Sequence, residues 1–188
     1  ISPEQALDSP LSSVIDIAAR MAELCRGSLV EPLSCWMQDL NAEQVRQMTV
    51  EQHRVVNMRS LVKVSWSLGV PVIPLSDVPA RSKSIDAIVD CSNGRPVVAL
   101  SSRHASPAWM VWHLAFALSH ISAVAADHRS VLVDLLAPDT TAGRAQGLEF
   151  ASILIHGKNN PFIEGHERIT GVKLAALARE YSREHGLE

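Results

Sequence analysis

The stretch WHLAFALSHI, residues 112–121, decides how the fold of this chain is interpreted. It lies in a segment that favours a helix from about residue 107 to 126, because Ser106-Pro107 is a typical helix start. Near the end of the stretch stands His120, flanked by small and apolar residues. Taken alone, the stretch predicts an ordinary core helix that ends in a histidine.

The segments around this helix predict an α+β domain. Upstream, helical spacing of apolar residues predicts helices over 11–26, 29–40 and 50–68, ended by Gly27 and Gly69, with Asn41 capping a short turn. Three short strands follow, over 70–75, 85–89 and 96–100; two prolines favour an edge position for the first, and Asn93-Gly94 predicts a hairpin between the others. Downstream, 130–136 fits a short strand or a helix, and helices are expected over 142–155 and 170–185. We therefore expect a small antiparallel or mixed β-sheet packed with helices in a domain over 50–188, preceded by an N-terminal helical extension over 1–49.

Composition and charge narrow the class of protein. Of the 188 residues 47% are hydrophobic and 20% are charged, which is ample for a packed core. The net charge of −3, without a run of like charges, argues against direct contact with nucleic acid. No signal pattern and no apolar run of about 18 residues occur, so we expect no membrane contact and a cytoplasmic location.

The three cysteines, Cys25, Cys35 and Cys91, lack C-x-x-C spacing and are expected to be reduced thiols. Because the chain begins at Ile1, we expect a processed protein or a fragment that has lost an N-terminal domain.

Four ordered pieces of the sequence resemble the ImmA/IrrE-type zinc metallopeptidase domain. Residues 95–100 (RPVVAL) resemble the family's strand before its catalytic helix, and 112–121 stand where that helix carries H-E-x-x-H. Upstream, 61–75 (LVKVSWSLGVPVIPL) are similar to the family's entry to the sheet. Downstream, 149–155 (EFASILI) and 174–184 (LAALAREYSRE) are similar to its last two helices. The resemblance covers roughly 50–185 and implies a zincin-like core.

The family's catalytic residues are not retained at the matching positions. The resemblance places the two histidine ligands at Phe116 and His120, the general base at Ala117 and the third ligand at Gln146. A phenyl ring cannot coordinate zinc and a methyl group cannot accept a proton. We therefore expect no catalytic residue and no cofactor, and we treat these four residues as former-cleft positions, with His120 bonded to a neighbour such as Gln146. His120 and Glu149, three positions after Gln146, are the weak candidates for a remaining metal site.

Other constellations fit catalysis poorly. His113 and His120 are seven residues apart, about 10.5 Å along a helix, which is too far for two imidazoles to share a metal. His113 could share a metal with His104, His128 or His156, but nothing in their spacing requires it. We expect these four to be hydrogen-bonded or surface residues. Ser119 and His120 point about 100° apart on a helix, so with Asp134 they cannot form a nucleophile–base pair. Trp109 and Trp112 are expected in the core.

Two functions follow from the resemblance. The first is a catalytically inactive regulatory or interaction domain whose partner is a helix-turn-helix repressor or a fused DNA-binding domain, with a small ligand as another occupant. The alternative is an active zinc metallopeptidase that cleaves a repressor through a rearranged site, with His120 and a base such as Glu149 or Asp127. If the resemblance is accidental, the chain is a structural helical domain.

Overall fold

The computed structural model describes residues 10–28, 41–75, 85–91, 95–101, 106–125, 130–133 and 142–158, with short pieces at 176–177, 179–181 and 183–184. Within these ranges the chain forms five helices and four strands, in an order that mixes both types as expected of an α+β fold. In chain order they are α1 (Pro10–Gly27), α2 (Ala42–His53), α3 (Met58–Ser67), β1 (Val72–Leu75), β2 (Ala87–Asp90), β3 (Val97–Ser101), α4 (Pro107–Ala125), β4 (Ser130–Val133) and α5 (Ala142–His156).

The strands form one mixed sheet in the order β1-β3-β2-β4. β1 runs parallel to β3, while β2 is antiparallel to both β3 and β4. This arrangement confirms the small mixed sheet, the edge position of the proline-containing strand and the strand alternative for 130–133. The antiparallel pairing of β2 with β3 agrees with the expected hairpin, whose Asn93-Gly94 turn lies outside the described residues.

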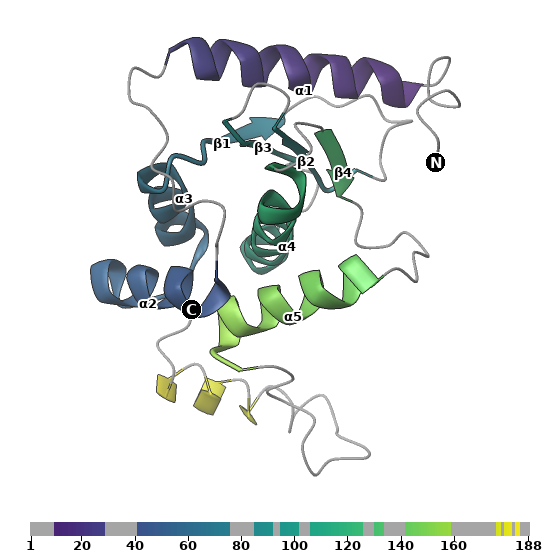
Figure 1. The fold of residues 1–188 in the computed structure, drawn as a ribbon. Coiled ribbons are helices and arrows are strands. Elements are labelled where there is room, and N and C mark those ends of the chain that lie inside the picture. The colour runs from purple at the N-terminus through teal and green to yellow at the C-terminus, as the bar shows by residue number, and fades with distance from the viewer. Residues whose placement is uncertain are drawn as a thin grey trace.

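Helices cover both faces of the sheet, and side-chain alternation along the strands assigns the faces (Figure 1). Ile88 and Ala99 point towards α1, where they pack with Val14 and Ala18. Their strand neighbours, among them Val89 and Val98, point to the opposite face and join the larger core around α4. α4 therefore lies between the sheet and α5, which explains why most of its residues are apolar.

The helix expected over 50–68 is two helices, and this part of the prediction was wrong. Arg54 adopts a left-handed backbone conformation (φ 64°) and ends α2, and Asn57 then caps α3 in a reciprocal capping box with Ser60. These capping interactions override the apolar spacing that runs through both segments. Asn41 accepts a hydrogen bond from the Glu43 amide, as a cap should, but it begins the 12-residue helix α2 instead of a short turn.

The carboxyl end of α5 is held by residues distant in the sequence. Arg46 of α2 donates hydrogen bonds to the carbonyls of Leu154 (3.2 Å) and Ile155 (2.6 Å), two of the acceptors that a helix end leaves unsatisfied. The Tyr181 hydroxyl donates to the carbonyl of His156. The carboxyl end of α5 is thus fixed to α2 and to Tyr181.

Two expectations concern segments that are described only in part. The helices predicted over 29–40 and 170–185 lie outside the described residues, apart from the short pieces after residue 175. Of the expected N-terminal extension, α1 packs on β2 and β3, and residue 49 lies within α2 and not in a linker. The division into two units stays a prediction. No helix in the described ranges is both long and apolar enough to cross a membrane.

Candidate functional site

The four former-cleft positions lie at or near the contact between α4 and α5. Ala117 is fully buried, and the Phe116 side chain is 3% exposed. Both belong to the large core cluster, together with Leu114 on the same helix and Leu154 on α5. Two of the positions that the resemblance assigns to catalysis are therefore part of the apolar core.

The ring of Phe116 lies directly against the backbone of α5 at Gly147. A Cβ atom added to Gly147 would stand 2.6 Å from Cε2 of Phe116 and 2.9 Å from Oγ of Ser119. Real Cβ atoms do not approach other heavy atoms so closely, so the absence of a side chain at 147 is what gives the ring its place. Residue 147 directly follows Gln146, which links the packing of Phe116 to the position of the expected third ligand.

His120 lies one turn after Phe116 and contacts it through the ring. The two ring centroids are 5.0 Å apart and the planes meet at 80°, an edge-to-face arrangement. Burial lowers the pKa of His120 below its ordinary value of 6.5, because the charged imidazolium loses hydration. The side chain is therefore neutral at pH 7 and acts as a partly buried aromatic ring.

Gln146 and Glu149 are exposed on α5. No hydrogen bond joins Gln146 to His120 among the described residues, so the expected contact between these two is not seen. The described ranges also contain no group of three His, Cys, Asp or Glu side chains close enough to hold a metal ion. Asp127, the other expected base of a rearranged site, lies outside the described residues.

Of the remaining histidine and serine candidates, the structure describes the contacts of Ser119 and His156. Ser119 donates its hydroxyl hydrogen to the carbonyl of Phe116 (2.6 Å), and Asp134 lies outside the described residues. His156 stands at the end of α5 beside the rings of Trp112 and Tyr181. His104 and His128 fall on segments that are not described.

A buried polar pair that the sequence analysis did not single out joins β2 to α4. Asp86 precedes β2 in a bend, and its Oδ2 lies 3.3 Å from Nδ1 of His113, with both side chains almost fully buried. The ring of Trp109, one turn earlier on α4, lies 5.9 Å from that of His113. A usable signal was present in the sequence, because aspartates flank the apolar run 87–89 on both sides. An acid beside a fully apolar strand needs a partner when it is buried.

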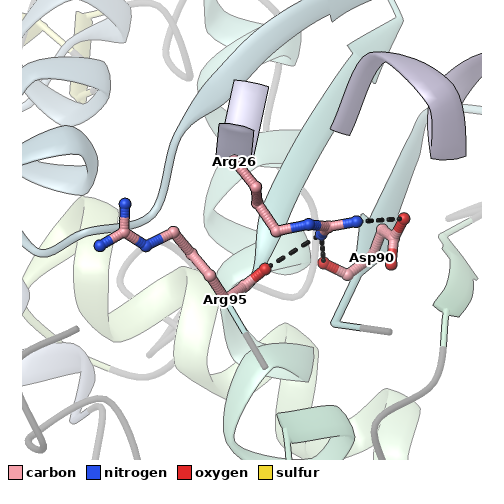
Figure 2. Close-up of polar contacts among 3 residues, drawn as sticks. All are labelled: Arg26, Asp90 and Arg95. Atoms are coloured by element: carbon pink, nitrogen blue, oxygen red, sulfur yellow. Dashed lines mark hydrogen bonds and ion pairs between the residues drawn. The ribbon is translucent and has the colours of Figure 1, made fainter. Parts of the chain in front are cut away.

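The second of these aspartates is paired on the other face of the sheet (Figure 2). Arg26 of α1 contacts the Asp90 carboxylate at 3.4 Å and donates to the carbonyls of Asp90 (3.4 Å) and Arg95 (3.1 Å). Both ends of β2 are thus tied by a charged group to a different helical layer. Sequence spacing could not pair residues that lie 64 positions apart.

The tryptophan and cysteine expectations had mixed outcomes. Trp112 is partly buried and packs against the core, but Trp109 is 55% exposed, so its expected place in the core was wrong. The first turn of α4, residues 107–109, is exposed as a whole, which leaves the Trp109 indole partly in water.

Cys25 and Cys91 are free, and burial raises the pKa of the Cys91 thiol to about 11. Cys35 and Trp36 lie outside the described residues.

Comparison with known proteins identifies no relative. No family model matches the chain, and neither a curated protein sequence nor a solved structure matches it. The case for a function therefore depends on the residues and contacts described above.

Proposed function

We propose that this chain is a degenerate zincin-like domain of the ImmA/IrrE type that acts by binding a protein and not by hydrolysis. Support comes from the sequence resemblance together with the place of residues 116, 117 and 120 on the helix beneath a small mixed sheet. The observation that carries the proposal is the burial of Phe116 against Gly147.

The physical argument concerns what a zinc ligand at position 116 would need. A catalytic zinc requires three protein side chains and an open position for water. Here the first ligand position holds a ring that fills its space up to the backbone of α5, and burying such a ring is favourable by roughly 1.5–3 kcal/mol. At position 117 a buried methyl group replaces the base. Close apolar packing at both positions fits a domain that keeps a stable fold without the reaction.

The partner class that we propose is a helix-turn-helix repressor, encoded beside the chain or fused to it. The resemblance suggests this class, and the charge of this chain agrees with it. A net charge of −3 suits contact with a basic DNA-binding protein better than contact with DNA itself.

Zinc content tests the catalytic half of the proposal. Elemental analysis of the purified chain, loaded with zinc and then dialysed, should find far less than one zinc per chain, and the His120→Ala variant should give the same value. His53→Ala, which removes a half-buried histidine at the end of α2, serves as the control for adventitious binding. One zinc per chain that is lost in His120→Ala and kept in His53→Ala would overturn the proposal.

Co-expression tests the binding half. The tagged chain and the helix-turn-helix repressor encoded nearest to it are expected to purify together, with the repressor intact on a gel. Repressor fragments that accumulate only with the parent chain, and not with His120→Ala, would establish cleavage and contradict a binding role.

A further inference from the structure

The described residues near the carboxyl terminus lie outside the layers of the fold. Of those between 176 and 184, Tyr181 is buried, Leu177 is partly exposed and the others are exposed. The short yellow pieces in Figure 1 lie beyond α2 and α5, on the side away from the sheet. In the described part of this segment, contact with the fold is therefore made chiefly by the Tyr181 side chain.

Tyr181 packs against the carboxyl end of α5. Its hydroxyl donates a hydrogen bond to the carbonyl of His156, 25 positions earlier in the sequence. The ring centroids of these two residues lie 6.0 Å apart with the planes at 69°, and Nζ of Lys158 lies 5.6 Å from the centroid of the Tyr181 ring. Burial raises the pKa of the Tyr181 phenol, because the charged phenolate loses hydration, and nearby Arg46 offsets part of this rise. The phenol is thus bound as a neutral donor at a helix end.

The end of α5 is also fixed by contacts that do not involve Tyr181. Arg46 of α2 donates hydrogen bonds to two carbonyls in the last turn of the helix, at 3.2 and 2.6 Å. On the side of α4, the ring of Trp112 lies 6.2 Å from that of His156. The surface against which Tyr181 packs should therefore keep its shape when this side chain leaves.

Release of Tyr181 should be easier than unfolding of the core. It breaks the hydrogen bond to α5 and exposes one aromatic ring, and it returns conformational freedom to a stretch of backbone whose other described side chains are already largely in water. Unfolding of the core exposes the whole apolar cluster around α4. Segments with few buried contacts open locally at a free energy below that of global unfolding.

We propose that the carboxyl-terminal segment around Tyr181 is a strap that closes on the end of α5 and opens while the rest of the fold stays intact. In the closed form Tyr181 covers the ring and the carbonyl of His156. In the open form both face water, so the strap controls access to this end of α5. The inference goes beyond the proposed function and does not depend on it.

Fluorine NMR tests whether the strap opens by itself. Tyr181 is the only tyrosine of the chain, so the full chain labelled with 3-fluorotyrosine reports on this contact alone. We expect a main signal displaced from that of the urea-unfolded chain and, by saturation transfer, exchange with a minor signal at the unfolded position. As urea is added, the minor signal should grow before helical circular dichroism is lost. A main signal already at the unfolded position, or a minor signal that appears only with the loss of helix, would overturn the proposal.

Variants that keep the label then test the closing contacts. His156→Ala removes the ring that Tyr181 contacts and should raise the ratio of open to closed strap several-fold. Lys158→Gln, at an exposed position, removes the cation over the ring and should raise the ratio about two- to fivefold. His53→Ala, at the end of α2, is the matched control and should leave the ratio unchanged. Lys158→Gln decides the matter if His156→Ala fails to fold, and an unchanged ratio in the folded variants would show that the strap closes elsewhere.

Protein concentration separates closure within one chain from exchange between copies. The ratio of open to closed strap should be the same in dilute and concentrated samples. A ratio that changes with concentration would show that the strap of one copy closes on another, and would contradict closure within the chain. Stoichiometric zinc dependent on His120 would overturn the proposed function and leave the strap unaffected.

Discussion

Replacing Gly147 with alanine tests whether the Phe116 ring fills the α4–α5 contact. Two opposing effects decide the result. Alanine is favoured over glycine in a helix by about 1 kcal/mol. Against this, the new Cβ would lie 2.6 Å from Cε2 of the buried Phe116 ring, and overpacking of a core costs typically 1–3 kcal/mol. Oγ of Ser119, at 2.9 Å, can move by rotation of a small side chain, so the ring dominates the cost.

We therefore expect Gly147→Ala to lower the free energy of unfolding by about 1 kcal/mol, the difference between these two effects. Urea unfolding followed by helical circular dichroism measures it, with an unchanged m-value expected. Gly27→Ala is the matched control, because it also lies in a helix but its added Cβ would meet nothing within 4 Å. That variant should leave the stability unchanged or raise it by up to about 1 kcal/mol.

The Phe116→Leu background separates propensity from packing. With the ring removed, Gly147→Ala should stabilise the protein relative to Phe116→Leu alone, so the double-mutant cycle gives a coupling of about 1–3 kcal/mol. Gly147→Ala that stabilises the parent as much as Gly27→Ala does, with no coupling to residue 116, would refute the argument that the ring is packed against α5.

Three further predictions concern the contacts that hold the layers together. Arg46→Met should lower the free energy of unfolding by about 1.5–3 kcal/mol, because the last carbonyls of α5 lose a charged donor; Arg46→Lys, measured in the same urea series, should recover part of the loss. Arg26→Met should lower the free energy of unfolding by about 3–5 kcal/mol in thermal or urea unfolding, because it leaves the Asp90 carboxylate buried without its cation. The double variant Arg26→Met/Asp90→Leu should lower it by less. Equal losses in the two variants would contradict the pairing. Burial lowers the pKa of His120 in the folded state, so below about pH 6.5 the unfolded state binds more protons than the folded state. The free energy of unfolding should therefore fall as the pH drops through that value. In His120→Asn this fall should be smaller.

Much of the fold could be predicted because the deciding signals are local. Proline in 70–75 indicated an edge strand, Asn-Gly between two apolar runs indicated antiparallel pairing, and the apolar run before His120 indicated a buried helix. Each of these depends on the backbone and side chains of a few consecutive residues. The break between α2 and α3 is also local, but the left-handed conformation of Arg54 has no glycine to mark it.

The contacts within the candidate site could not be predicted in the same way. Phe116 was recognised as a residue unfit for zinc, but its packing depends on a glycine 31 positions later that no local pattern connects to it. The pairing of Asp86 with His113 and of Asp90 with Arg26 likewise depends on how the layers stack. Sequence spacing along one helix predicts which residues share a face, but not which residue of another element lies opposite.

The distribution of buried polar groups argues that β2 is the element whose placement this fold specifies most strictly. At the α4–α5 contact, where the resemblance places catalytic chemistry, a phenyl ring, a methyl group and a glycine pack by shape. In the part of the chain that the structure describes, the buried carboxylates lie instead beside the two ends of β2, where Asp86 contacts α4 and Asp90 contacts α1. A slip of one residue in β2 would send the apolar side chains of Ala87 and Val89 to the α1 face and carry Asp90 away from Arg26 into the core around α4. Since an unpaired buried carboxylate costs several kcal/mol, these two acids oppose every register but the observed one.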